Sequence, residues 1–270
     1  MDLAHAAAVL AANAGLLAGA YAGLWLISLA LRDVSFIDAA WALGMAALAA
    51  ATFAQIGEPS PHRLLLVGLC SLWAVRLGGH LLIRWRAHGA DPRYRKLLDD
   101  AKANQGWDFP VASLLLVFAL QAPLLFVVCL PVQLGQIGPA PASLGPLAAC
   151  GAVLALVGIG FETIGDAQLA RFRADPANRG KVLDTGLWRY TRHPNYFGDA
   201  CAWWGLYLIA AETPLGAWSA PGPILLTWTL MKWSGAPMLE GRLRETRPDY
   251  AAYVEATSGF VPWPPKRRPA

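Results

Sequence analysis

The stretch 187-LWRYTRHPNYFGDACAWWGLYL-208 changes from polar to apolar near its middle, and the rest of the chain is organised around it. Proline fixes φ and disfavours a helical conformation for the residue before it. We therefore expect His193 to be extended and a helix to begin near Asn195, with Asn195 as its N-cap. The free N–H groups of a helix start, beside Arg192 and His193, suit a phosphate or a carboxylate. The alternative is an interfacial anchor, since Arg, His, Trp and Tyr collect at membrane boundaries.

The composition is that of an integral membrane protein. Only 15% of the 270 residues are charged and 56% are hydrophobic, whereas a soluble domain carries about 25% charged residues. The net charge of +4 is small and the basic residues are clustered, which favours membrane topology and anionic ligands over nucleic-acid binding. The four cysteines stand singly in apolar stretches, so we expect neither a metal site nor a disulfide framework.

Seven apolar runs predict an all-helical protein with about seven transmembrane helices. They cover residues 6–31, 34–56, 64–85, 109–131, 143–170, 196–211 and 217–239. Basic residues gather at 84–102, 171–192 and 242–268, and none occurs at 131–143 or 212–220. Cytoplasmic loops are enriched in Lys and Arg, so we expect the N-terminus outside and the C-terminus in the cytoplasm.

Charged side chains inside predicted spans are costly and usually face an interior site. Asp38 lies near the start of the second run, where it either interacts with the helix dipole or belongs to a site. Arg76, His80 and Arg84 recur every four residues and so share one helix face. Arg76 either pairs with Asp38 or takes part in catalysis, and we take Asp38, Arg76 and His80 as the catalytic candidates. Gln121, in the middle of the fourth run, is interpreted as an interhelical hydrogen bond.

A second group of polar residues ends the fifth run. Glu162 and Asp166 are four residues apart, and Arg171 and Arg173 follow. Carboxylates beside arginines suit the ribose or amide and the phosphates of a nucleotide, although a salt-bridge cluster at a helix end is the alternative. Residues 242–254 are expected to form a short amphipathic helix on the inner membrane surface.

Four strings carry a family resemblance: SFIDAAWALG (35–44), FETIGDAQLARFR (161–173), GLWRYTRHPNYFGD (186–199) and RPDYAAYVEATSGFVPWPP (247–265). With them the chain resembles the bacterial membrane proteins related to steroid 5α-reductases. The resemblance implies a single seven-helix domain in the bacterial inner membrane that uses NADPH to reduce 3-oxo-Δ4 steroids or similar enones. It also implies that residues 1–131 form the lipophilic substrate pocket and that residues 143–270 hold the cofactor.

Carried over residue by residue, the resemblance places cofactor contacts at Asp166, Arg173 and Asn195. The loop HGADPRY (88–94) corresponds to a family segment near the adenosine phosphate end, which makes Arg93 and Tyr94 candidates as well. From the chemistry of this sequence we add their neighbours and one residue near the C-terminus: Glu162, Tyr190, Arg192, His193, Tyr196, Asp199 and Glu240.

The resemblance is imperfect at the catalytic residues. The animal enzymes polarise the substrate carbonyl with a Glu from the second helix and a Tyr from the third. Here the second predicted helix offers Asp38, and the third contains Arg76 and His80 but no tyrosine. No GxGxxG motif follows a predicted strand, so NADPH binding is expected from the resemblance and the charges and not from a Rossmann fingerprint.

Two other functions fit parts of the sequence. S-adenosylmethionine-dependent methyltransferases of the isoprenylcysteine carboxyl type share the Arg-His-Pro-x-Tyr-x-Gly turn and a C-terminal acidic residue. They usually have a Glu-Glu pair, where this chain has Glu240-Gly241. A non-enzymatic sterol- or lipid-binding protein is the third possibility, although Glu162 and Asp166 would repel anionic head groups. The expected partners are a lipophilic small molecule and the lipid bilayer, with no nucleic acid and no metal.

Overall fold

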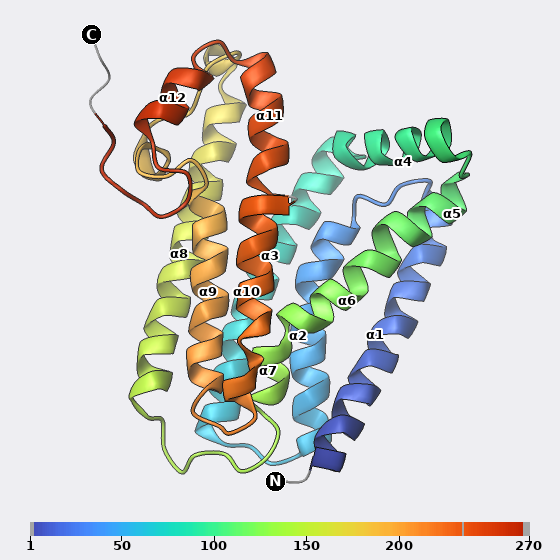
Figure 1. Cartoon of the computed structure of the whole chain (residues 1–270), viewed down its shortest axis with the longest axis vertical. Helices are drawn as coiled ribbons and strands as arrows, with labels where there is room; N and C mark the ends of the chain where they lie inside the picture. The colour runs from blue at the N-terminus through green and yellow to red at the C-terminus, as the bar shows by residue number, and fades with distance from the viewer. Residues whose placement is uncertain (1–2, 234, 267–270) are drawn as a thin grey trace. The chain divides into compact units, whose positions relative to one another are not determined.

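Five helical segments are long and apolar enough to cross a membrane (Figure 1). The computed structural model describes residues 3–233 and 235–266, except for the side chains of residues 237–239 and 242. The five segments are α1 (Leu3–Leu31), α2 (Ile37–Ile56), α3 (Pro61–His88), the continuous run of α5 (Phe109–Ser113), η1 (Leu114–Phe118) and α6 (Ala119–Val128), and α8 (Pro146–Ala174). The predicted all-helical membrane class is thereby confirmed, since the described residues contain no strand.

The sixth and seventh predicted spans are shorter or interrupted. α9 (Pro194–Ala210) has 17 residues, slightly fewer than the ~20 that a spanning helix needs. The predicted run 217–239 is divided among η4 (Gly216–Ser219), α10 (Pro221–Trp228), the π-helical η5 (Thr229–Trp233) and the start of α11 (Ala236–Thr246). The count of seven spans and the orientation of the termini therefore stay predictions.

Shorter helices connect the long ones. They are α4 (Pro92–Gln105), α7 (Leu130–Leu134), η2 (Pro176–Asn178), η3 (Gly186–Arg189) and α12 (Tyr250–Ala256). The prediction of one helix over 242–254 is wrong, because α11 ends at Thr246 and α12 begins at Tyr250. Pro248 accounts for the break, since it disfavours a helical conformation at Arg247, whose φ of −134° and ψ of 103° are extended.

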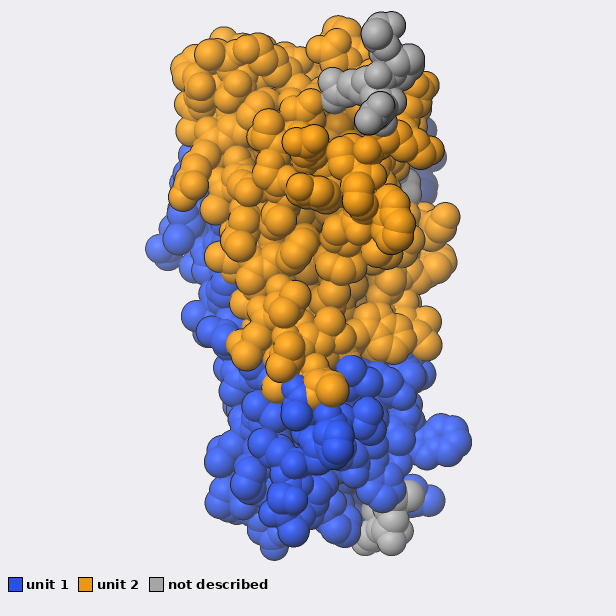
Figure 2. Space-filling model, turned by 90° about the vertical axis from the view of Figure 1, so that its left-hand side faces the viewer, with its two compact units in different colours: residues 1–149, 207–222 blue, residues 150–206, 223–270 orange. Residues whose placement is uncertain are grey.

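The chain divides into two compact units (Figure 2). Unit 1 comprises residues 1–149 and 207–222, and unit 2 comprises residues 150–206 and 223–270. Within unit 1, α2 packs along α3. The buried side chains of α2 include Ala42, Met45, Ala49 and Thr52, a spacing of three and four residues that keeps them on one helix face. The predicted functional division into 1–131 and 143–270 stays a prediction.

Within unit 2, α8 and α9 approach closely because glycines face backbone atoms of the other helix. A Cβ built on Gly158 would lie 2.5 Å from Ala202 N and from Gly198 O, and one on Gly205 would lie 2.5 Å from Gly151 O. Small residues that let two backbones approach in this way are typical of helix pairs in membranes. No larger side chain fits at these points.

Gly158→Ala is expected to lower the free energy of unfolding by about 1–3 kcal/mol, because the added methyl group would push α8 and α9 apart. The matched control is Gly160→Ala on the same helix, where a Cβ would meet nothing within 4 Å. This control should leave stability unchanged or raise it slightly, since Ala is the better helix former. Unfolding of the full chain in mixed micelles with increasing SDS, followed by circular dichroism, measures both. Equal losses in the two variants would contradict the close approach.

Candidate functional site

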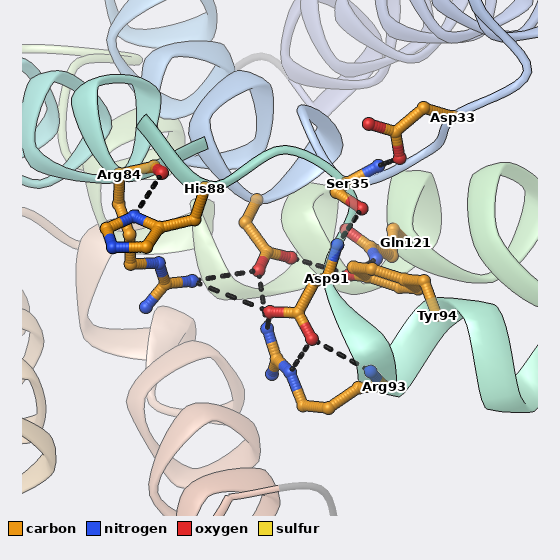
Figure 3. A network of polar contacts seen from close by, with 9 residues as sticks. Asp33, Ser35, Arg84, His88, Asp91, Arg93, Tyr94 and Gln121 are labelled. Carbon is orange, nitrogen blue, oxygen red and sulfur yellow. Dashed lines mark hydrogen bonds and ion pairs between the residues drawn. The ribbon is translucent and has the colours of Figure 1, made fainter. Parts of the chain in front are cut away.

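A network of polar contacts in unit 1 surrounds Asp38, in the first turn of α2 (Figure 3). The Tyr94 hydroxyl donates to Asp38 Oδ1 over 2.5 Å, and Gln121 Nε2 donates to Tyr94 Oη over 2.9 Å. Arg93 Nη2 lies 2.8 Å from Asp38 Oδ2. Arg84 Nη2, on α3, lies 3.7 Å from the same oxygen. We call Asp38, Arg84, Asp91, Arg93, Tyr94 and Gln121 the Asp38 cluster.

The start of α4 positions Arg93 and Tyr94. Asp91 caps this helix by accepting from Arg93 N over 2.9 Å, and Pro92 stands at the first helical position. Asp91 Oδ2 also forms a 3.0 Å ion pair with Arg93 Nη2, and the backbone N–H of Asp91 donates to Ser35 Oγ over 2.7 Å. The loop before α2 thus fixes the start of α4.

A second carboxylate holds that loop in place. Asp33 accepts from Ser35 N and from Trp85 Nε1 on α3, each over 2.8 Å. The side chains of Asp33, Ser35 and Asp91 therefore connect the loop between α1 and α2 with the end of α3 and the start of α4, as Figure 3 shows for the labelled residues.

The protonation of the Asp38 cluster follows from burial and charge. Burial raises the pKa of Tyr94 well above its ordinary value, and the charge of Asp38 raises it further. Tyr94 therefore keeps its proton at neutral pH and can donate it in a hydrogen bond. Burial alone would raise the pKa of Asp91, but the hydrogen bonds and charge of Arg93 outweigh that effect and lower it.

The structure thus joins residues for which the sequence predicts different roles. Asp38 is predicted as catalytic, whereas Arg93 and Tyr94 are predicted as cofactor contacts, and all three lie in one cluster. The prediction of an interhelical hydrogen bond for Gln121 is confirmed, with Tyr94 as the acceptor. On α3, His80 lies one turn and Arg76 two turns before Arg84. Both are partly buried, and their catalytic role stays a prediction.

The pairing of Tyr94 with Asp38 is not predicted from the sequence. The resemblance implies a tyrosine within the third helix, whereas Tyr94 lies just beyond the end of α3, in the first turn of α4. The signal available in the sequence is the Asp-Pro-Arg-Tyr string, because Asp-Pro predicts a helix start that holds the next two side chains in fixed directions.

A second cluster, in unit 2, surrounds Glu240 on α11. Arg192 Nε lies 2.8 Å and His193 Nε2 2.9 Å from Glu240 Oε1. The His193 ring stacks on Tyr196, with centroids 5.2 Å apart and planes at 8°. We call Arg192, His193, Tyr196 and Glu240 the Glu240 cluster. In this cluster the basic turn and the C-terminal acidic residue meet.

The pKa of Glu240 reflects this arrangement. Burial alone would raise it, but the hydrogen bonds from His193 and Arg192 and the Arg192 charge lower the pKa of Glu240 to about 2. The carboxylate is thus ionised at every physiological pH, and the Arg192 guanidinium neutralises it.

The Arg-His-Pro turn is also hydrogen-bonded to the C-terminal segment. Arg192 Nη1 donates to Val254 O over 3.1 Å and to Thr257 O over 2.8 Å, and Arg192 N donates to Ser258 O over 2.9 Å. Tyr253 Oη donates to Trp188 O over 2.5 Å. The Arg192 guanidinium, expected to suit a phosphate, is therefore largely engaged by acceptors of the protein.

Asn195 pairs with the fifth predicted span. Its Nδ2 donates to Asp166 Oδ1 over 3.2 Å, which brings together two of the three contacts that the resemblance implies. The prediction of Asn195 as N-cap is wrong, because α9 begins at Pro194 and His193 O accepts the first helical hydrogen bond, from Phe197 N over 3.0 Å. Asn195 lies inside the first turn, so its side chain is available to Asp166.

The other predicted residues of unit 2 divide by exposure. Glu162, Asp166 and Asp199 are buried. Arg173 lies in the last turn of α8. Tyr190 is 44% exposed, and its backbone oxygen accepts from Trp263 N. Their roles toward a cofactor stay predictions. Within the described part of the chain, no group of three His, Cys, Asp or Glu side chains has a metal-binding arrangement.

Comparison with known proteins places the chain in a family without an assigned function. The chain is 31% identical over 104 residues to an uncharacterized protein of Schizosaccharomyces pombe. That match covers 34% of this chain and 27% of the yeast protein. No solved structure matches the chain. Residues 24–257 match the family described as "Protein of unknown function (DUF1295)", which is most of the chain, and the protein therefore belongs to this family.

Proposed function

We propose that the protein is an NADPH-dependent reductase of the C=C bond of a lipophilic enone, such as a 3-oxo-Δ4 steroid. The observation that carries this proposal is the hydrogen bond from Tyr94 to Asp38, because it supplies a tyrosine–carboxylate pair in a chain whose third helix has no tyrosine. The family's relationship to steroid 5α-reductase-like proteins supports it as well.

The chemistry requires a hydrogen-bond donor at the substrate carbonyl. Addition of hydride to the β-carbon of an enone leaves negative charge on the carbonyl oxygen, and a preorganised donor stabilises that charge. The hydroxyl of Tyr94 is protonated at neutral pH and accepts a hydrogen bond from Gln121, so its own hydrogen points away from Gln121. In the proposed reaction the carbonyl oxygen replaces Asp38 Oδ1 as the acceptor of that hydrogen, and the α-carbon takes its proton from water.

Asp38 and Arg93 serve as positioning residues in this scheme. Asp38 holds the Tyr94 hydroxyl in place before the substrate binds, and the 2.8 Å contact with Arg93 holds Asp38. When the carbonyl takes the hydroxyl, Asp38 keeps its ion pair with Arg93, so no unpaired carboxylate is left behind. Arg76 and His80 remain candidates for a second donor on the same substrate.

Unit 2 contains donors and acceptors of the kind that a nicotinamide dinucleotide needs. The amide–carboxylate pair of Asn195 and Asp166 offers hydrogen bonds to a ribose hydroxyl or a carboxamide, and Arg173 offers charge to phosphates. The buried Nδ1 atom of His193 has no hydrogen-bond partner among the described residues, which leaves it available to a ligand. NADPH, when bound, supplies the hydride.

A methyltransferase is the second candidate, favoured by one contact. Arg192 and His193 of the Arg-His-Pro turn both contact Glu240, which is the combination shared with the isoprenylcysteine carboxyl methyltransferases. Native mass spectrometry of the purified protein separates the two functions. Retained NADPH would support the reductase, and retained S-adenosylmethionine would overturn it in favour of the methyltransferase.

Asn195→Ala is expected to weaken NADPH binding by about 1–3 kcal/mol, since it removes a hydrogen-bond partner of the buried Asp166 as well as a contact to the cofactor. Asn104→Ala, on an exposed position of α4, is the control and should bind as the wild type does. Titration of the detergent-solubilised protein, followed by tryptophan fluorescence, measures both. Unchanged affinity in Asn195→Ala would remove this residue from the proposed cofactor site.

A further inference from the structure

Unit 2 contains a pocket of about 90 Å³. Of its lining residues in the described part of the chain, only Arg192 belongs to the Asp38 or the Glu240 cluster. The end of α8, the segment 181–192 and the helices α11 and α12 form its walls. Four cationic side chains line it: Arg173, Lys181, Arg192 and Arg247. None of the described residues that line it is an Asp or a Glu. Cationic side chains in the walls of a cavity attract an anion.

Arg247 is the strongest indication of an anion site. Its Nη1 atom is buried and has no hydrogen-bond partner within the described part of the protein. A buried guanidinium N–H without an acceptor costs free energy, and an anion in the pocket would provide the acceptor. The backbone supports this placement, since Pro248 keeps Arg247 extended between α11 and α12.

The other cations contribute in different ways. Arg192 donates through Nε and Nη1 to Glu240, Val254 and Thr257, so it adds positive charge and few new hydrogen bonds. Lys181 is exposed at the rim, where its ammonium can move to meet a ligand. Two arginines and a lysine around one cavity suit the several terminal oxygens of a phosphate.

The remaining walls are apolar and rigid. Trp188 is buried, and its Nε1 donates to Gly165 O over 3.1 Å. Its backbone oxygen accepts the hydroxyl of Tyr253, so both aromatic side chains are held beside the cations. Phe172 and Leu183 also line the pocket. Apolar walls next to a phosphate site favour a phosphate that is attached to a carbon group over the free ion.

We propose that this pocket binds the phosphate monoester of an organic molecule, with Arg247 as the principal donor to its terminal oxygens. The cations lie in the walls of the pocket, so the ligand binds with its phosphate among them. A soluble nucleotide with a monoester, or a phospholipid whose head group is a terminal phosphate, would supply this chemistry.

Binding to the full-length protein in phosphatidylcholine nanodiscs tests the proposal. The probes are 2′-AMP and inorganic phosphate in solution, and phosphatidic acid incorporated in the nanodisc. Tryptophan fluorescence reports the soluble ligands, and native mass spectrometry reports retained lipid. We expect at least one organic monoester to bind, and Arg247→Gln to weaken it about tenfold, the effect of losing one charge-assisted hydrogen bond.

Arg179→Gln is the matched control, since Arg179 is an exposed arginine of the same loop region that does not line the pocket. It should bind every probe as the wild type does. Binding of 2′-AMP identifies a nucleotide as the source, and retention of phosphatidic acid identifies a lipid. The proposal is overturned if no organic monoester binds, if Arg247→Gln binds normally, or if Arg179→Gln loses as much affinity. Because the readout is binding, the result does not depend on whether the protein reduces enones.

Discussion

Tyr94→Phe is expected to slow enone reduction by about 100- to 1000-fold, the usual effect of removing one donor to a developing oxyanion. The substitution deletes the hydroxyl that bonds Asp38 and accepts from Gln121, while it keeps the aromatic ring. Single-turnover oxidation of bound NADPH by progesterone, followed by absorbance, measures the chemical step directly. NADPH affinity should stay within about twofold, because the proposed carbonyl donor acts on the transition state and not on the cofactor.

Tyr207→Phe serves as the control, since Tyr207 belongs to neither cluster and its hydroxyl donates to Ala217 O over 3.4 Å. A wild-type rate in Tyr94→Phe would remove Tyr94 as the donor and leave Arg76 and His80 as the candidates. Asp38→Asn then shows whether Asp38 acts as a proton donor or only positions the Tyr94 hydroxyl. An Asp38 that only positions Tyr94 should lose rate in the asparagine variant by less than Tyr94→Phe does, because the amide oxygen can still accept the hydroxyl.

Glu240→Gln is expected to lower the free energy of unfolding at pH 7 by about 3 kcal/mol. The pKa of Glu240 is about 2 in the folded protein against an ordinary value of 4.5, and each unit is worth about 1.4 kcal/mol. Its side chain is only 15% exposed, so solvent screens the pair little. Loss of the carboxylate would also leave Arg192 and His193 without their shared acceptor.

The pH dependence follows with a defined sign. A carboxyl group with a lowered folded-state pKa contributes its full stabilisation above about pH 4.5, and this contribution is lost as the pH falls toward 2. The wild type should therefore lose stability over this range, and Glu240→Gln should lose less. Glu245→Gln, one turn further along α11 and exposed, is the control and should behave as the wild type. Identical pH profiles for wild type and Glu240→Gln would contradict the ion pair. Thermal unfolding in detergent at several pH values gives the comparison.

The long apolar helices were predictable because each is a local property of the sequence. A run of about twenty apolar residues has few alternatives to a membrane helix, and five of the predicted spans are found as such helices. Local rules were less reliable at the ends of helices. Pro248 divides the predicted helix 242–254, and Pro194 takes the first helical position, which moves Asn195 from the predicted N-cap into the first turn.

The sequence indicated which residue types belong to the candidate site, but not which of these residues contact each other. The sequence identifies Asp38 and Gln121 as polar residues that need an explanation, and the family resemblance adds Tyr94 as a candidate cofactor contact. Tyr94 and Asp38 are 56 residues apart, however, and no local pattern indicates that they meet. The family resemblance implies that Asn195 and Asp166 contact the same cofactor, and the structure brings the two side chains within hydrogen-bond distance of each other.

The attachment of the basic turn to the C-terminal segment has a consequence for biosynthesis. The backbone oxygens of Val254, Thr257 and Ser258 accept hydrogen bonds from Arg192, and these residues are synthesised well after Arg192 itself. During translation this arginine and its neighbour His193 are therefore made before their final acceptors. The Asp38 cluster, by contrast, has all its members once Gln121 has left the ribosome. The polar site of unit 1 can thus assemble while the chain is still being made, whereas the basic turn of unit 2 can be completed only after its C-terminal partners have emerged.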